Sequence, residues 1–168
     1  TQGLMDFGYD VKMSEILGMS QRGGDVSSHV RYGDKVDSPV IEKGGADIIV
    51  AFEKMEALRF LDFLKPGGRV VVNDYEMPSM PIITGDASYP VHAIDEIGKH
   101  APVTVVKAAE IAQELGNGKV MNIILLGAII KAMGLESIDW TDIIKNNVKP
   151  DFIEINLMAV KRGMEAVR

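Results

Sequence analysis

The stretch ADIIVAFEKMEALRFLDFLKPGGRVVVND, residues 46–74, decides the fold class of this chain. Its first part, Ala46–Phe52, is a short apolar run of the kind that forms a strand buried on both faces. In Glu53–Leu64 the apolar residues recur at helical spacing, which predicts an amphipathic helix. The Pro-Gly-Gly turn at residues 66–68 stops that helix and leads into a second apolar strand, Arg69–Asn73. A strand, a helix and a strand in this order predict a parallel sheet covered by helices.

The flanking sequence continues this alternation. The segment Tyr75–Pro90 holds three prolines and is predicted to be an irregular loop. The helix over Glu53–Leu64 is expected to turn its charged residues to solvent: Glu53, Glu56, Arg59 and Asp62. The other expected elements are strands over Tyr9–Glu15, Val26–Tyr32 and Val103–Lys107, and helices over Ala93–His100, Ala108–Leu115, Val120–Met133 and Trp140–Asn147. Gly116 is expected to end one of these helices, Asp139 to cap another and Pro150 to begin the last one. That last helix has an apolar seam formed by Ile153, Leu157, Val160, Met164 and Val167.

Together these elements predict an α/β fold. We expect a mostly parallel, doubly wound sheet similar to the Rossmann fold, with helices on both faces and a helical C-terminal part. The chain has 168 residues, which suits one domain, and no linker or internal repeat divides it. Residues 1–168 are therefore expected to form a single domain.

The charge and composition exclude several classes of function. The chain carries 24 acidic and 18 basic residues, a net charge of −6, which argues against a nucleic-acid or anionic-membrane surface. It has no cysteine, so these residues form no disulfide and offer no thiolate to an iron–sulfur cluster. No stretch has the length of a membrane span, and the first residues lack the pattern of a signal peptide. We therefore expect a cytoplasmic protein without nucleic-acid or membrane partners.

A loop between the first two predicted strands is a candidate anion site. It contains Ser20, Gln21, Arg22, Gly23 and Gly24. Two glycines let the backbone come close to a ligand and point successive amides at it, and an arginine supplies a fork of donors. This combination suits a phosphate or a carboxylate. A glycine turn with a solvated arginine explains the same residues and is the commoner case.

Two further segments offer polar side chains to a ligand. Asn73 and Asp74 follow an apolar strand, and the carboxyl end of a parallel strand commonly faces a ligand crevice. The Pro-Gly-Gly turn before them also occurs in methyltransferases, but the acidic, glycine-rich nucleotide loop of those enzymes is absent upstream. Asn117 lies between two predicted helices and Asn122 within the second one, whose first amides could attract an anion. A tight structural turn is the alternative for both segments.

The sequence lacks the motifs of common catalytic sites. There is no nucleophile elbow, Walker loop, HExxH zinc motif or complete GxGxxG, and the thiamine-binding Gly-Asp-Gly is also missing. His29 has no neighbouring carboxylates, which makes it a poor metal ligand and favours either an exposed or a hydrogen-bonded core position. From the residues alone we expect no catalytic residue and no metal ligand, but a soluble α/β domain that could hold an anionic cofactor.

Several motifs in chain order resemble the gamma-type domain of 2-oxoacid:ferredoxin oxidoreductases. The likeness begins in Tyr9–Glu15 and in the loop Gly18–Val26, where Gln-Arg-Gly-Gly leads toward residues 28–31, Ser-His-Val-Arg. This loop is most similar to the beta subunit of indolepyruvate ferredoxin oxidoreductase. The likeness covers almost the whole chain through shorter motifs: Asp37–Pro39, Ala46–Asp47, Glu56–Arg59, Lys65–Gly68, Ala109–Ala112, Leu115–Asn117, Asn122–Ile123, Leu126–Ala128 and Glu154–Asn156.

The resemblance also shows one departure from the family pattern. The family normally opens with a buried strand and a Gly-x-Gly-Gly-Gln-Gly turn. The present sequence starts beyond that turn, and Thr1–Phe7 resembles the latter part of the helix that follows it. The resemblance therefore implies a sheet without the family's first strand, and the role of the glycine turn falls on no residue of this sequence.

The resemblance implies a function within a larger complex. The family oxidatively decarboxylates a 2-oxoacid such as indolepyruvate to an acyl-CoA, CO2 and reduced ferredoxin. That reaction uses thiamine diphosphate, iron–sulfur clusters and coenzyme A, and a larger catalytic subunit carries the first two. This chain would be the non-redox gamma- or beta-type subunit, which binds no cofactor alone, is inactive in isolation and could form a homodimer there.

Within that complex the chain is expected to shape the cofactor or coenzyme A side of the site. Arg22 and the amides of Gly23 and Gly24 would meet a phosphate group. The cofactor-binding candidates are Ser20, Gln21, Arg22, Gly23, Gly24, Asn73, Asn117 and Asn122. Two other hypotheses stay open: a gamma subunit that acts on pyruvate or another 2-oxoacid, and an independent nucleotide-binding or structural domain.

Overall fold

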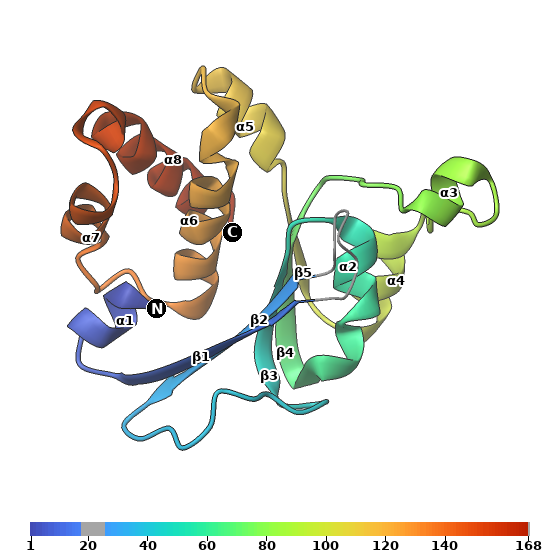
Figure 1. Cartoon of the computed structure of the whole chain (residues 1–168), viewed down its shortest axis with the longest axis horizontal. Helices are drawn as coiled ribbons and strands as arrows, with labels where there is room; N and C mark the ends of the chain where they lie inside the picture. The colour runs from blue at the N-terminus through green and yellow to red at the C-terminus, as the bar shows by residue number, and fades with distance from the viewer. Residues whose placement is uncertain (18–25, 168) are drawn as a thin grey trace.

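The computed structural model describes residues 1–17 and 26–167 and contains two sheets (Figure 1). The main sheet has three parallel strands in the order β3-β4-β5. A separate antiparallel hairpin is formed by β1 and β2. The strands are β1 (Asp10–Leu17), β2 (Val26–Gly33), β3 (Ala46–Ala51), β4 (Leu64–Asn73) and β5 (Val103–Val106).

Helices connect the parallel strands and form the C-terminal part of the chain. The α-helices are α1 (Gln2–Asp6), α2 (Lys54–Arg59), α3 (Met80–Thr84), α4 (Ala93–His100), α5 (Ala108–Glu114), α6 (Met121–Met133), α7 (Trp140–Asn147) and α8 (Ile153–Glu165). Short 3-10 helices precede β4, α6 and α8: η1 (Leu61–Phe63), η2 (Gly118–Val120) and η3 (Pro150–Phe152). Across the described ranges, no helix combines the length and the apolar character that a membrane crossing requires.

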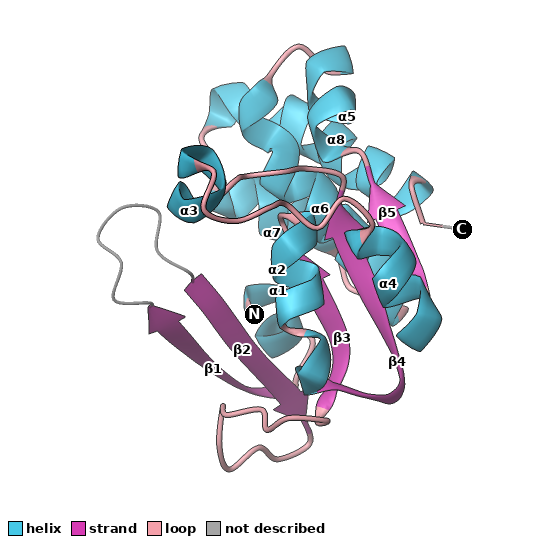
Figure 2. Ribbon diagram, turned by 90° about the vertical axis from the view of Figure 1, so that its right-hand side faces the viewer, coloured by secondary structure: helices cyan, strands magenta, loops and turns pink. Residues whose placement is uncertain are grey.

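Strand β4 lies in the middle of the main sheet and separates two apolar layers. Successive side chains of a strand point to opposite faces. Val70 and Val72 accordingly pack with Ala57 of α2 and Ile97 of α4, whereas Val71 joins the cluster formed with α5, α6 and α8. All five side chains are fully buried. The structure thus confirms an α/β fold with a parallel sheet, helices on both faces and a helical C-terminal part (Figure 2).

The long helices α6 and α8 cross at two glycines. A Cβ atom on Gly127 would lie 2.1 Å from the carbonyl oxygen of Val160, and one on Gly163 would lie 1.9 Å from the carbonyl oxygen of Ile124. Neither distance leaves room for a methyl group, so the two helices meet backbone to backbone. This contact covers much of the apolar surface that the sequence places on residues 120–133.

The buried face of α8 differs from the apolar seam predicted for it. The buried residues of this helix are Asn156, Ala159, Val160 and Gly163. Of these, Val160 alone belongs to the seam, and the other seam residues are half-buried. The small residues face α6 because they permit the closest approach of the two backbones. The spacing of hydrophobic residues, on which the prediction was based, carries no information about side-chain size.

Polar contacts attach the β1–β2 hairpin to the rest of the chain. The backbone N–H of Val36 donates to the Asp10 carboxylate at 2.8 Å, and that of Ile41 donates to Nδ1 of His29 at 3.0 Å. The His29 ring also packs edge-on against Phe63, with ring centroids 5.7 Å apart. His29 is therefore a buried, hydrogen-bonded residue, one of the two positions that the sequence predicted for it.

Four local predictions are corrected by the structure. The helix predicted over Glu53–Leu64 divides into α2 and η1. Glu53 does not face solvent: it is buried because its carboxylate caps α2. The Pro-Gly-Gly turn lies inside β4, where Gly67 takes the positive φ of 81°. The segment Tyr75–Pro90 is not wholly irregular, because it contains α3.

Two predicted helix ends are confirmed. The Asp139 carboxylate accepts the N–H groups of Thr141 and Asp142 at 3.1 and 3.2 Å and so caps α7. Gly116 follows α5 with a φ of 78°, the left-handed conformation that glycine adopts readily. Both signals are local, and this explains why the sequence was sufficient to find them.

The helix crossing predicts that Gly163→Ala destabilises the fold. The added methyl group would collide with backbone atoms of α6 rather than with a movable side chain, so the helices would have to separate. We expect the free energy of unfolding to fall by about 2–3 kcal/mol, as measured by urea denaturation.

Gly98→Ala in α4 is the matched control. A Cβ atom there would lie 3.9 Å from its nearest neighbour, a methyl group of Val103, so the methyl group fits. Because alanine favours a helix over glycine, this variant should gain about 0.5–1 kcal/mol of stability. Similar effects of the two substitutions would contradict a backbone contact at Gly163.

Candidate functional site

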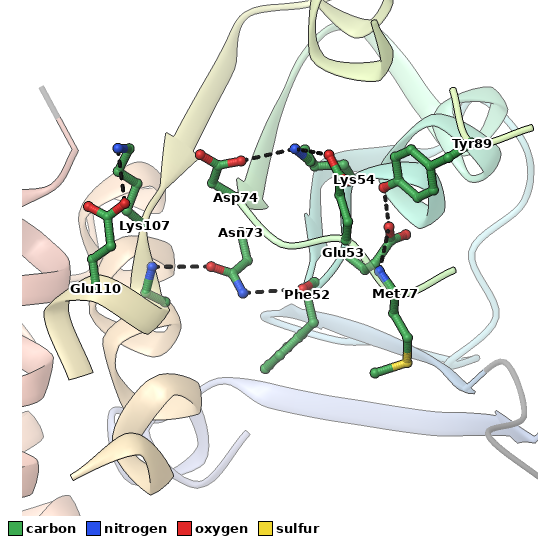
Figure 3. A network of polar contacts seen from close by, with 11 residues as sticks. Phe52, Glu53, Lys54, Asn73, Asp74, Met77, Tyr89, Lys107 and Glu110 are labelled. Carbon is green, nitrogen blue, oxygen red and sulfur yellow. Dashed lines mark hydrogen bonds and ion pairs between the residues drawn. The ribbon is translucent and has the colours of Figure 1, made fainter. Parts of the chain in front are cut away.

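The carboxyl ends of the three parallel strands form a polar edge of the main sheet (Figure 3). Phe52 directly follows β3, Asn73 is the last residue of β4, and Lys107 directly follows β5. In open α/β sheets, ligands bind in the crevice outside these strand ends. This edge of the sheet is therefore a candidate functional site.

The side-chain amide of Asn73 connects the three strand ends. Its Nδ2 donates to the carbonyl oxygen of Phe52 at 3.2 Å and contacts the sulfur of Met121 at 3.7 Å. Its Oδ1 accepts the backbone N–H of Ala108, the first residue of α5, at 3.1 Å. Asn73 is fully buried, and both ends of its amide are engaged by the protein. The group therefore fixes the ends of β3 and β5 relative to β4.

The Glu53 carboxylate gathers donors from three segments. One oxygen accepts the N–H of Glu56 at 2.9 Å, which caps α2. The other accepts the N–H of Met77 at 3.3 Å and the hydroxyl of Tyr89. Bonds from several donors compensate a buried carboxylate for its lost hydration. Glu53 thus holds both ends of residues 77–89 against the start of α2.

The surroundings raise the pKa of two titratable groups near Glu53, Tyr89 and Lys54. Partial burial raises the pKa of Tyr89 well above its ordinary value of 10.0, and the adjacent Glu53 carboxylate adds to the effect. The Lys54 ammonium lies 2.7 Å from Glu76 and 3.1 Å from Asp74. The hydrogen bond to Glu76 is the largest cause that raises the pKa of Lys54, so this lysine stays charged. Both groups hold their protons at neutral pH and act as donors.

The remaining charges at this edge also pair with one another. Lys107 lies 3.1 Å from Glu110, in the first turn of α5, and both side chains are exposed. The edge is thus a framework of mutually satisfied polar groups. Such a framework positions neighbouring segments, and it places no activated nucleophile among the residues drawn in Figure 3.

The loop Ser20–Gly24, the main anion site predicted from the sequence, lies outside the described residues. The hairpin that flanks it is described on both sides. Leu17 ends β1 and Val26 begins β2, opposite each other in the register, and their exposed fractions are 69% and 58%. The part played by Ser20, Gln21, Arg22, Gly23 and Gly24 in cofactor binding stays a prediction.

The other three candidates occupy different environments. Asn73 is buried at the strand ends. Asn117 is half-buried and caps η2, because its Oδ1 accepts the N–H of Lys119 at 3.0 Å. Asn122 is exposed in the first turn of α6. Asn73 is connected with Asn122 through Met121, which touches Asn73 and directly precedes Asn122. A ligand role for the three asparagines stays a prediction.

Sequence reasoning missed Glu53 and Tyr89. The position of Glu53 held a usable signal, since an acidic residue directly after a buried strand and before a helix is a common N-cap. Tyr89 lies among prolines 36 residues away and gave no local signal. Only the return of the chain from α3 brings its hydroxyl to Glu53.

A cleft of about 930 Å³ lies at the other end of the sheet, between β2 and the first residues of β3 and β4. The protein itself engages the basic side chains that line it. Lys65 pairs with Asp47. Arg69 donates to the carbonyl oxygen of Ala132 at 3.1 Å, and Arg31 donates to a loop carbonyl at the same distance. Of the predicted site residues that the structure describes, Asn73, Asn117 and Asn122, none lines this cleft.

The Tyr89→Phe variant tests the contact with Glu53. It removes the hydroxyl donor and keeps the ring, so we expect a loss of about 1.5 kcal/mol in the free energy of unfolding. Because the pKa of Tyr89 is raised in the folded state, its stabilisation is complete below the unfolded pKa of about 10 and is lost as the pH rises through the folded value. The stability difference between wild type and variant should therefore shrink above about pH 10, as followed by urea denaturation.

Tyr75→Phe is the control for this variant. Tyr75 lies at the start of the same segment and its side chain is 40% exposed. Its substitution should change the stability by less than about 0.5 kcal/mol. A difference between wild type and Tyr89→Phe that stays constant from about pH 8 to about pH 11 would contradict the assigned pKa shift.

Comparisons with known proteins extend over almost the whole chain. A sequence model of the family described as pyruvate ferredoxin/flavodoxin oxidoreductase matches residues 1–166. Indolepyruvate oxidoreductase subunit IorB of Thermococcus kodakarensis is 34% identical over 169 aligned residues, which cover 96% of this chain and 83% of the relative.

Two solved structures share the fold. The gamma subunit of a keto/oxoacid ferredoxin oxidoreductase from Geobacter sulfurreducens has a TM-score of 0.64 at 20% identity, and the match covers 96% of this chain and 81% of that one. The 2-oxoglutarate:ferredoxin oxidoreductase from Magnetococcus marinus, solved with 2-oxoglutarate, coenzyme A and succinyl-CoA, has a TM-score of 0.67 at 16% identity. That match covers 98% of this chain and 27% of the larger chain. The full-length family match confirms the resemblance carried by the motifs, and this chain belongs to the pyruvate ferredoxin/flavodoxin oxidoreductase family.

Proposed function

We propose that this chain is the small, non-redox subunit of a 2-oxoacid:ferredoxin oxidoreductase. The observation that carries the proposal is the 34% identity, over 96% of the chain, to a protein named as a subunit of indolepyruvate oxidoreductase. The complex would convert a 2-oxoacid to an acyl-CoA and CO2 and pass the electrons to ferredoxin. Residues 1–168 would act there as one gamma-type domain in the cytoplasm.

The composition supports a division of labour between two chains. Iron–sulfur clusters are held mainly by cysteine thiolates, and these 168 residues contain none. The Gly-Asp-Gly signature for thiamine diphosphate is also missing. The residues present therefore do not fit either group, and we assign both to a larger partner subunit. The small subunit would be inactive alone and would shape the chamber in which the partner reacts.

The residues do fit one part of coenzyme A, its phosphates. A guanidinium and two glycine amides are donors of the kind that bind a phosphate, and Arg22, Gly23 and Gly24 supply them in succession. Leu17 and Val26, the described residues on either side of this loop in the sequence, are both exposed. Coenzyme A, when bound, accepts the acyl group, and the loop would hold its phosphate end. Ser20, Gln21, Asn117 and Asn122 are further candidates, whereas Asn73 would act by positioning the strand ends.

The favoured substrate is an arylpyruvate such as indolepyruvate, because the relative at 34% identity carries that name. Pyruvate or another 2-oxoacid is the alternative, since the Magnetococcus marinus protein with the same fold is a 2-oxoglutarate:ferredoxin oxidoreductase. An independent nucleotide-binding or structural domain is the second alternative, and assembly with a catalytic subunit distinguishes it from the first.

Reconstitution tests the proposed function. Three preparations are compared: this chain expressed alone, the thiamine- and cluster-binding large subunit expressed alone, and the two chains expressed together. Each preparation is assayed with coenzyme A, ferredoxin and three substrates: indolepyruvate, pyruvate and 2-oxoglutarate. We expect turnover only from the pair and the highest kcat/KM with indolepyruvate. Turnover by the isolated small chain, or a large subunit equally active without it, would refute the proposal.

Arg22→Ala in the reconstituted pair tests the coenzyme A site. Loss of a charge-assisted phosphate contact costs about 1.5–3 kcal/mol, which corresponds to a rise of about 10- to 150-fold in the KM for coenzyme A. Arg22→Lys is the control, because it keeps the charge without the fork of donors. Its KM for coenzyme A should lie between those of the wild type and Arg22→Ala. An unchanged KM and an unchanged kcat in Arg22→Ala would remove this residue from the site.

A further inference from the structure

Between β4 and α4 the chain leaves the body of the protein and returns to it, with α3 at the tip (Figures 1 and 2). We call residues 77–91 the projecting arm. Four large apolar side chains of the arm are mostly exposed: Met77 at 59%, Met80 at 67%, Ile83 at 66% and Val91 at 78%. Apolar side chains gathered on one exposed element commonly mark a protein interface.

The arm differs from the rest of the chain in composition. One of its 15 residues, Asp86, is charged, whereas charged residues make up 25% of the whole chain. Extending the range to the base of the arm adds Asp74 and Glu76, so residues 74–91 contain three acidic side chains and no Lys, Arg or His. At the base, Lys54 pairs with both Asp74 and Glu76, so one ammonium meets two carboxylates and a net negative charge stays beside the apolar tip.

The arm is held rigidly at its base, although its tip is exposed. Glu53 accepts hydrogen bonds from the N–H of Met77 and from the hydroxyl of Tyr89, and these residues lie at the two ends of the arm (Figure 3). At the tip, the N–H of Asp86 donates to the carbonyl oxygen of Pro81 at 2.8 Å. A segment that is already ordered loses little entropy when it binds, so these contacts favour association.

We propose that the projecting arm docks into an apolar socket with a basic rim on the larger catalytic subunit. This inference rests on the proposed function, which supplies the partner. Charge favours that partner over a second copy of this chain, because each copy carries a net charge of −6 and the arm base, with two carboxylates for one ammonium, adds to the repulsion between copies. Met80 and Ile83 would be the anchors, and the contacts of Glu53 would present them in a fixed orientation.

The test uses the double variant Met80→Ser, Ile83→Ser in the pair with the large subunit. We expect the dissociation constant of the pair, measured by titration calorimetry, to rise by at least about tenfold. Because both side chains are mostly exposed in the isolated chain, the urea midpoint of the small subunit should stay unchanged. Met158→Ser is the matched control: Met158 is an exposed methionine, at 43%, on α8, and its substitution should change the dissociation constant by less than about twofold.

Hydrogen exchange of the wild-type pair gives a second, variant-independent measurement. Formation of the pair should protect the amides of residues 77–91, and the affinity should weaken as the salt concentration rises because of the charged rim. If the pair forms but the double variant binds equally well and residues 77–91 gain no protection, the arm proposal is overturned while the proposed function stands. If the wild-type chain does not bind the large subunit at all, both are overturned. If the isolated chain self-associates through Met80 and Ile83, the occupant is a second copy and the proposed partner is wrong.

Discussion

The arrangement of the sheet edge depends on the buried side-chain amide of Asn73. This amide bonds to Phe52, the residue directly after β3, and to Ala108, the first residue of α5, so three strands from distant parts of the sequence end in a fixed relation. An unpaired buried amide would cost free energy, and here both of its ends are paired. The chain that follows Asn73 therefore starts from a defined point. Glu53 then binds that chain again at Met77 and at Tyr89.

This framework accounts for where function can lie in the molecule. The polar groups at the strand ends are used to hold the protein together. Leu17 and Val26, which flank the predicted phosphate loop in the sequence, are exposed, and the arm presents apolar side chains on α3 and on either side of it. Exposed segments of this kind suit the proposed function, in which the reacting cofactors sit on a partner subunit. The family membership relates this chain to oxidoreductase subunits.

Local chemistry was readable from the sequence wherever neighbouring residues determine the structure. The apolar run Ala46–Phe52, the N-cap Asp139 and the left-handed Gly116 are examples, because each depends on adjacent residues or on a short repeat. The candidate site was harder to predict. Asn73 was found because it ends a recognisable strand, but its amide turned out to bond to segments 21 and 35 residues away. Glu53 was expected in solvent, since helical periodicity alone does not show what the returning chain places above it.

The sequence by itself determined the fold class, the parallel strands and the family, because hydrophobic periodicity and ordered motifs act along the chain. The absence of cysteine also determined that these residues supply no thiolate to a cluster. Only the tertiary structure decided which face of α8 is buried, since the backbone contact at Gly127 and Gly163 depends on the approach of two helices rather than on the hydrophobicity of either. It also decided that Glu53 and Tyr89 meet, because a contact between residues 36 positions apart exists only once the chain between them has folded back.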